Sequence, residues 1–351
     1  MTMDPFLGLV LISAGGLAAA SFYTPFKRVR GWAWETFWLA FGVVSWVVGP
    51  WTVACLVCPD LRGVLASVSM GTLVLCYVFG ALWGIGSLTN GLAIRYMGLS
   101  LGFALPMGVC AAAGTLLPPL VKGELAPMLG RTSGVVALVS VVVGLVGIAI
   151  CGRAGVMKDR ELSAERKAAA VSEFNLTRGV WLSVLSGIMS ACMAFAIEYG
   201  GPISKAALGA GTPALYQNAP MFVVILLGGF TSNCAWCLSL GVRNRTVGQF
   251  GGGAGAPAAA NYLLCFLAGA IWYLQFLFYG MGRTTMGRYD FTSWSIFMAC
   301  IIIFSNLWGV LFGEWAGTGR RTKVWLVTGL IVLALSAVLT SYGDYLQSHG
   351  S

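Results

Sequence analysis

Apolar runs of about 20 residues, the length that crosses a bilayer as an α-helix, recur along the whole of this sequence. Charged residues make up 9% of the chain, against about 25% in ordinary soluble domains. The runs also lack the alternating segments of about 10 residues that membrane β-barrels require. The sequence therefore predicts an all-α integral membrane protein of ten transmembrane helices, near residues 5–26, 34–58, 70–93, 99–121, 132–152, 177–199, 214–238, 260–282, 291–313 and 323–343.

The charges between these runs orient the chain. Asp4 precedes the first run and Lys27, Arg28 and Arg30 follow it, the reverse of a signal peptide, so we expect a retained helix. Fifteen of the 21 Lys and Arg residues lie on one side of the predicted topology. Because positive loops stay in the cytoplasm, we expect both termini on the outer side of the membrane, which is the periplasmic side if the membrane is a bacterial inner membrane. The net charge of +9 then requires no nucleic-acid partner.

One motif occurs twice in the chain. Residues 80–83 read GALW and residues 269–272, which lie 189 positions later, read GAIW. A charged connection, residues 153–176, separates five predicted helices from the other five. Because five is odd, the second half enters the membrane from the opposite side, so the duplication is inverted. The predicted domains are a first five-helix repeat over residues 1–152, the cytoplasmic loop, and a second repeat over residues 177–351.

In each copy, polar side chains share a helical face with the tryptophan, at spacings of three, four or seven residues. Inverted-repeat transporters bind their solute near the bilayer midplane, between the repeats, so we expect the two indoles to face each other there. Indole faces suit the C–H faces of a small polar solute, and amides and hydroxyls suit its hydroxyl groups. The alternative is packing, in which these polar groups join helices. The predicted substrate-binding residues are Trp83, Ser87, Asn90, Trp272, Gln275 and Tyr279.

Other chemistries are largely excluded. The single histidine, His349, is two residues from the end, which removes histidine-based catalysis and His-containing metal sites from the membrane core. The two CxxC pairs, 55–58 and 234–237, fall on opposite sides of the predicted membrane, so they cannot share a metal ion, and both lie in apolar surroundings, where cysteine packs as a small hydrophobe. We expect no metal site, no bound cofactor and no enzymatic activity.

Two carboxylates are candidates for binding a coupling proton. Glu198 and Asp290 lie near the outer ends of predicted helices, where ionisation at membrane depth is costly. Both could also simply reach the outer aqueous boundary, and Asp290 could cap its helix or pair with Arg288. Glu35 and Glu314, each beside a tryptophan at a cytoplasmic helix end, are predicted to be interfacial anchors.

Several motifs together resemble the L-rhamnose–proton symporter family, part of the drug/metabolite transporter superfamily. They run in order along nearly the whole chain: FYTPFKRVRGWAWETFW (22–38), GALWGIG with GLAIRYMGLSLG (80–102), EFNLTRG (173–179), WYLQFLFYGMG (272–282) and YDFTSW (289–294). The resemblance implies a drug/metabolite transporter-like fold of two inverted five-helix repeats and uptake of a deoxyhexose with a proton. The residues of this chain that stand inside the shared motifs, and to which the resemblance applies most directly, are Trp83, Trp272, Gln275, Tyr279, Tyr289 and Asp290.

Glu198 stands outside the shared motifs, so the resemblance favours Asp290 over Glu198 as the residue that binds the coupling proton. Arg95, at the cytoplasmic end of its helix, is predicted to orient that helix or to act at a gate, and Tyr289 is the second gating or orientation candidate.

The leading hypothesis is import of L-rhamnose, or a similar neutral deoxyhexose or pentose, by proton symport, with sodium as an alternative coupling ion. A drug/metabolite-type exporter of amino acids or lipophilic cations is the alternative, but it would need a carboxylate beside the midplane tryptophans. The expected partners are the sugar and the lipid bilayer, and the oligomeric state is left open.

Overall fold

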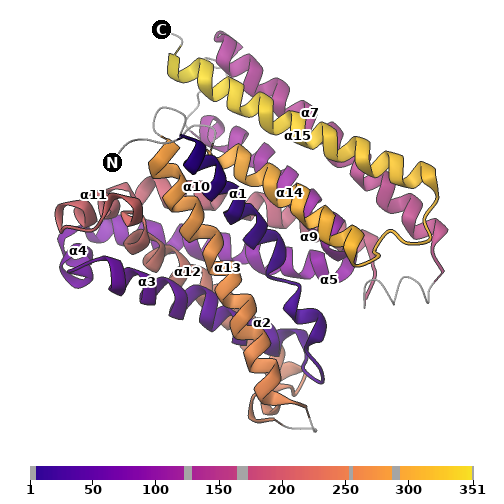
Figure 1. Cartoon of the computed structure of the whole chain (residues 1–351), viewed down its shortest axis with the longest axis horizontal. Coiled ribbons are helices and arrows are strands. Elements are labelled where there is room, and N and C mark those ends of the chain that lie inside the picture. The colour runs from indigo at the N-terminus through magenta and orange to yellow at the C-terminus, as the bar shows by residue number, and fades with distance from the viewer. Residues whose placement is uncertain (1–4, 122–128, 164–172, 253–255, 287–292, 350–351) are drawn as a thin grey trace. The chain divides into compact units, whose positions relative to one another are not determined.

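The protein is described from a computed structural model over residues 5–121, 129–163, 173–252, 256–286 and 293–349. These residues form helices joined by short connections, and the described part of the chain contains no β-strand (Figure 1). The helices are α1 (Pro5–Ser21), α2 (Trp34–Gly42), α3 (Gly49–Val57), α4 (Leu61–Ser67), α5 (Met70–Val121), α7 (Thr132–Glu161), α9 (Leu176–Ser190), α10 (Cys192–Tyr199), α11 (Gly201–Gly209), α12 (Ala219–Arg243), α13 (Ala258–Met286), α14 (Ser293–Leu311) and α15 (Arg320–His349).

Membrane-spanning segments account for most of this helical content. Within the described residues, eight helical segments are long and apolar enough to cross a bilayer. One of them, Met70–Gly114, covers two of the predicted helices, and the predicted ninth helix contains a shorter apolar segment, Ile296–Leu311. An all-helical, multi-pass membrane protein is therefore confirmed.

The chain reverses direction inside α5. Gly98 has φ 84° and ψ 178°, a backbone conformation open to glycine but strained for other residues. A Cβ on Gly102 would lie 2.5 Å from the Cα of Ile94, although residues eight apart in a straight helix are separated by about 12 Å. The two parts of α5 therefore fold back on each other at Gly98, between the predicted helices 70–93 and 99–121.

The chain forms two compact units, and neither unit is one continuous stretch of the sequence. Unit 1 comprises Met1–Ala20, Gly86–Ala191 and Thr285–Ser351, and unit 2 comprises Ser21–Ile85 and Cys192–Thr284. Each unit takes segments from both halves of the chain.

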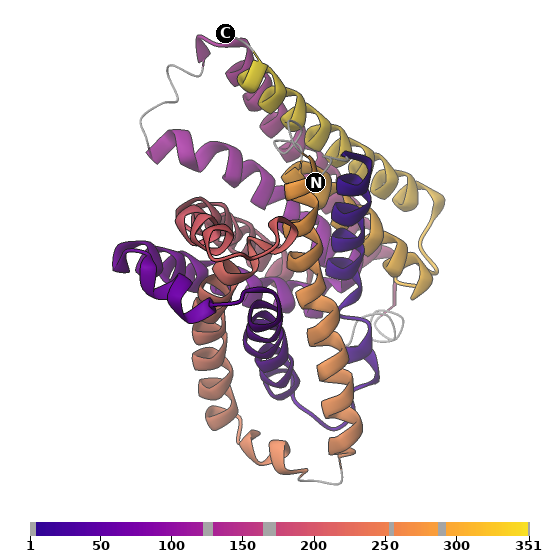
Figure 2. The same cartoon turned by 60° about the vertical axis from the view of Figure 1, so that its left-hand side comes forward.

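In unit 1, α7 and α15 lie side by side along their lengths, as both views show (Figures 1 and 2). The hydroxyl of Ser336 on α15 donates to the carbonyl oxygen of Ser140 on α7 at 2.8 Å. A Cβ on Gly147 of α7 would lie 2.9 Å from a side-chain carbon of Leu333. Small residues on both helices thus allow a close approach, as is usual between helices in lipid.

Unit 2 contains a feature that the sequence did not predict. Between α2 and α3 the backbone forms a π-helix over Val43–Val48, a conformation that is rare and often marks functional sites. Trp46, which lies within this segment, is fully buried. The predicted helix at 177–199 also differs, because it extends to Gly209 as three pieces, α9, α10 and α11.

Candidate functional site

Each copy of the repeated motif begins with a glycine at a helix crossing in unit 2. A Cβ on Gly80 of α5 would collide with the carbonyl oxygen of Ile225 on α12. A Cβ on Gly269 of α13 would lie 2.7 Å from the Cβ of Val44 in the π-helix. Each glycine therefore lets its helix approach a neighbour closely, one turn before the tryptophan of the same motif.

The two tryptophans of the motif meet. The ring centroids of Trp83 and Trp272 are 5.8 Å apart, with the planes tilted by 41°. Trp46 contacts Trp272 edge to face at 5.5 Å, and Phe276 contacts both Trp83 and Trp272. We call this set the indole cluster; its members are Phe41, Trp46, Trp83, Phe222, Trp272 and Phe276.

Gln275 lies one turn from Trp272 on α13 and is 7% exposed. Its side-chain Nε2 is buried and has no hydrogen-bond partner among the described residues. The indole Nε1 of Trp46, in the same cluster, is also buried without such a partner. Because buried donors are normally satisfied, these two N–H groups beside aromatic rings suit a ligand that brings acceptor oxygens.

Tyr279, the fourth site residue predicted in this part of the chain, lies on the same face of α13 as Trp272 and is buried. Four of the predicted substrate-binding residues, Trp83, Trp272, Gln275 and Tyr279, therefore belong to unit 2.

Ser87 and Asn90 belong to unit 1. Both side chains are half-buried. The Oδ1 atom of Asn90 is a buried acceptor without a hydrogen-bond partner in the described part of the chain. Nearby, the hydroxyl of Ser186 on α9 donates to the carbonyl oxygen of Gly86 at 2.8 Å, which ties α9 to this turn of α5.

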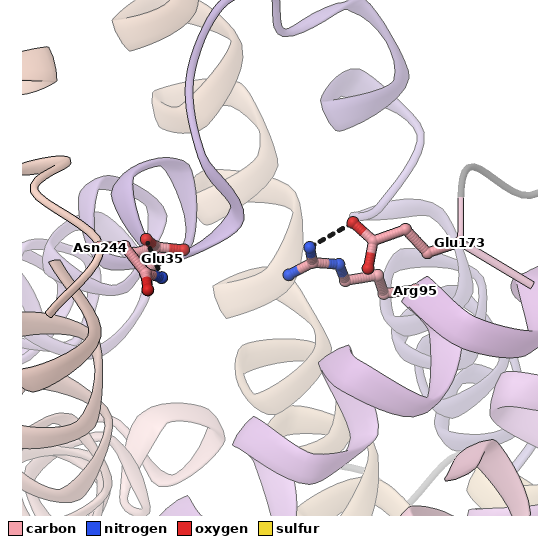
Figure 3. Close-up of polar contacts among 4 residues, drawn as sticks. All are labelled: Glu35, Arg95, Glu173 and Asn244. Carbon is pink, nitrogen blue, oxygen red and sulfur yellow. Dashed lines mark hydrogen bonds and ion pairs between the residues drawn. The ribbon is translucent and has the colours of Figure 1, made fainter. Parts of the chain in front are cut away.

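The coupling and gating candidates differ in their surroundings. Glu198 is exposed near the end of α10. Arg95 forms an ion pair with Glu173, which lies within the charged connection 153–176 (Figure 3). Tyr289 and Asp290 lie outside the described residues, so their predicted roles stay predictions.

Two carboxylates that were predicted to be interfacial anchors are buried instead. Glu35 of α2 is 5% exposed and accepts hydrogen bonds from Asn244 Nδ2 and Thr246 Oγ1, each at 2.9 Å (Figure 3). Glu314 is 1% exposed and accepts bonds from two backbone N–H groups. The anchor prediction was wrong, because both carboxylates are buried and bonded within the protein. Their hydrogen-bond partners lie more than 200 residues away in the sequence, so the residues beside each carboxylate did not indicate them.

The sequence analysis also missed Trp46, Phe41, Phe222 and Phe276. Trp46 carried a usable signal, because it lies near the middle of the apolar run 34–58 and tryptophan at mid-depth does not suit an interfacial position. Phe276 follows Trp272 by four residues and so shares its helical face. Phe41 and Phe222 have no signal of this kind, since phenylalanine is ordinary in any apolar helix.

Comparison with known proteins gives a consistent result. The model of the family described as L-rhamnose-proton symport protein matches residues 1–345. The L-rhamnose-proton symporter of Cronobacter sakazakii is 38% identical over 340 residues, which cover 96% of this chain and 97% of the relative. Proteins of the same name from Shigella sonnei and Citrobacter koseri are each 36% identical, and each alignment covers 98% of both chains. No solved structure matches the chain significantly. The matches extend over nearly the whole length of both partners, so this chain belongs to the L-rhamnose–proton symport protein family.

Proposed function

We propose that this protein imports L-rhamnose together with a proton, as a secondary active transporter without enzymatic activity or a bound cofactor. Relatives that align over nearly their whole length carry the name L-rhamnose-proton symporter. Nothing in the family relationship supports the alternative of an exporter of amino acids or lipophilic cations.

The observation that supports a sugar site best is the unpaired Nε2 of Gln275 beside the indole cluster. A deoxyhexose presents apolar C–H faces to aromatic rings and oxygen atoms to N–H donors. The described side chains of the cluster carry no charge, which suits a neutral solute. In this proposal Trp83, Trp272, Gln275 and Tyr279 bind the sugar, and a role for Ser87 and Asn90, which belong to unit 1, stays a prediction from the sequence.

The proposed architecture is ten transmembrane helices in two inverted five-helix repeats, as in the drug/metabolite transporters. The pattern of helix crossings within unit 2 supports it. Counted in the predicted order, Gly80 of the third helix meets the seventh, and Gly269 of the eighth helix meets the second. An inverted repeat exchanges the second helix with the seventh and the third with the eighth, so these two crossings are equivalent. The proposed location is the inner membrane, and the unequal loop charges support an orientation with both termini on the periplasmic side.

The direct test of this function uses the purified protein in liposomes, with the pH recorded on both sides of the membrane. L-rhamnose added outside is expected to enter the vesicles, acidify the interior and alkalinise the medium, without a need for sodium. Other hexoses and pentoses, amino acids and lipophilic cations serve as the comparison panel. Rhamnose entry without proton movement would remove the symport mechanism, and no rhamnose entry with clear transport of another solute would remove the substrate.

Asp290→Asn tests the leading coupling candidate from the sequence. This change keeps the size of the side chain and removes its ability to exchange a proton. We expect sugar-driven alkalinisation of the medium to be abolished while sugar binding stays largely intact. Glu198→Gln, which alters an exposed carboxylate, is the matched comparison. Proton movement at the wild-type rate in Asp290→Asn would exclude Asp290 from coupling.

A further inference from the structure

A groove on the surface of unit 2 is lined by apolar side chains. Its volume is about 300 Å³, at the lower end of the range for ligand pockets. Two of its side chains are exposed, Trp51 at 39% and Val74 at 49%, so the groove is open on one side. The lining residues come from four helices and include Trp51 of α3, Leu65 of α4, Val74 and Tyr77 of α5, and Val224 and Leu227 of α12.

The one hydroxyl group among the lining side chains, that of Tyr77, is already bonded within the protein. It lies 2.7 Å from Thr231 Oγ1, and Thr231 Oγ1 itself donates to the carbonyl oxygen of Leu227 at 3.0 Å. Because a hydroxyl group has a single hydrogen to donate, Tyr77 is the donor in its bond to Thr231. The groove therefore suits an apolar occupant rather than a sugar.

The groove lies beside the close crossing of α5 and α12. A Cβ on Gly228 of α12 would collide with the carbonyl oxygen of Tyr77 on α5, and Gly80 makes the second close contact of the same crossing. Val74 and Val224, which precede these glycines on the two helices, line the groove. An occupant of the groove would therefore pack against both helices of the crossing.

The groove extends from the membrane surface into the hydrocarbon layer. Three of its four helices belong to the membrane-spanning segments Trp34–Val57, Met70–Gly114 and Ala214–Arg243. The fourth, α4, has seven residues and connects the first two of these segments, so it lies at the membrane surface. The surroundings of the groove below α4 are acyl chains. Because lipid tails are as apolar as the groove itself, a preference of one lipid for this place must come from its fit and its headgroup.

A side chain that can bind phosphate lies at the surface end of the groove. Arg62 is exposed and precedes Leu65 on α4 by three residues, so the two share one face of that helix. Lys205 is also exposed and lies on α11, which packs against α4 (Figure 1). The one acidic residue of this connection, Asp60, accepts the backbone N–H of Gly63 at 2.8 Å. Since guanidinium groups bind phosphate oxygens through charge-assisted hydrogen bonds, Arg62 complements the phosphate of a lipid.

We propose that this groove binds a phospholipid of the surrounding bilayer, with one acyl chain packed against α5 and α12 and the phosphate bound by Arg62. The acyl chain fills the space that the protein leaves open beside the crossing, and the phosphate gains a cation at the level of the headgroups. None of the lining residues belongs to the indole cluster. The lipid site is therefore distinct from the proposed sugar site and does not depend on rhamnose transport.

Photolabelling of the full-length wild-type protein gives the first test. The protein is placed in liposomes of dioleoyl phosphatidylglycerol with a trace of the same lipid carrying a photoreactive group on one acyl chain, and mass spectrometry of peptides locates the label. We expect labelling of Tyr77 and Val224 to exceed that of Val142 and Ile331 about fivefold or more. The latter two are far more exposed, at 60% and 63%, so labelling that follows exposure alone would overturn the proposal.

Val224→Trp tests the groove itself, because the larger side chain fills it. Val142→Trp is the matched control at an exposed position of α7 outside the groove. Purified proteins are titrated with dioleoyl phosphatidylglycerol, and native mass spectrometry counts the lipids that stay bound. Val224→Trp should lose the most tightly bound lipid and Val142→Trp should keep it. Equal retention by the two variants, or detergent adducts alone in the wild type, would contradict a lipid site in the groove.

Arg62→Gln tests the phosphate contact in the same titration. The Kd of the tightly bound lipid should rise about fivefold, whereas Arg131→Gln, which changes another exposed arginine, should leave it unchanged. Diolein, which has the same acyl chains and no phosphate, should bind the wild type more weakly than the phospholipid does. An unchanged Kd in Arg62→Gln, or equal binding of the two lipids, would overturn the proposal. The labelling and the diolein comparison use the wild type, so they decide the matter even if a variant fails to fold.

Discussion

Gln275→Ala is expected to weaken L-rhamnose binding by about 1–3 kcal/mol, which is about 5- to 150-fold in Kd. The side chain is 7% exposed and its Nε2 has no partner among the described residues, so a sugar oxygen gives this amide the bond that the protein lacks. Removing the amide leaves the sugar oxygen desolvated and unpaired in the complex. The measurement is equilibrium binding of L-rhamnose to the purified protein, by calorimetry or by quenching of tryptophan fluorescence.

Asn233→Ala provides the matched comparison. Asn233 of α12 is also a buried amide, but it accepts from the indole Nε1 of Trp38 at 3.0 Å and donates to the carbonyl oxygen of Gly84 at 2.8 Å. Its loss should lower the stability of the protein and leave the affinity of the folded fraction close to that of the wild type. Wild-type affinity in Gln275→Ala would mean that this face of α13 serves packing alone.

Gly80→Ala is expected to destabilise the folded protein by about 3 kcal/mol, the upper part of the usual range for overpacking. The new methyl group would collide with the carbonyl oxygen of Ile225, and a backbone atom within a helix cannot move aside as a flexible side chain can. Gly269→Ala, at the equivalent crossing, should show a loss of similar size. Unfolding in detergent, followed by heating or by added denaturant, gives the comparison.

Gly152→Ala is the control for this pair of variants. A Cβ at Gly152 of α7 would meet no atom within 4 Å, so the same chemical change should leave stability within about 0.5 kcal/mol. Equal stability in Gly80→Ala and Gly152→Ala would contradict a close crossing of α5 and α12. A large loss in Gly80→Ala without one in Gly269→Ala would contradict the equivalence of the two crossings.

Local patterns in the sequence predicted some of this structure well. Apolar length placed most of the helices, and the boundary expected between residues 93 and 99 coincides with the reversal at Gly98. The repeated motif identified Trp83 and Trp272, and the structure brings these two rings together. Both successes depend on information that lies within one helix or within an internal repeat.

Features that depend on distant partners could not be predicted in this way. The run VVSWVV (43–48) has the apolar character of an α-helix, and its π-helical form accompanies close packing of Val44 on Gly269 of α13. The burial of Glu314 depends on two backbone N–H groups more than 200 positions earlier in the chain. A charged residue beside a tryptophan at a helix end resembles an interfacial anchor until its partners are known.

The intermixing of the two halves within each compact unit has a consequence for biogenesis. Unit 2 is complete once residue 284 has been synthesised, whereas unit 1 needs the last segment, 285–351. During translation, the helices of unit 1 that enter the membrane first must therefore wait for α14 and α15 with their small-residue surfaces covered by lipid or by the insertion machinery. A ribosome stalled after residue 284 would leave the indole cluster assembled while unit 1 still lacked its last segment.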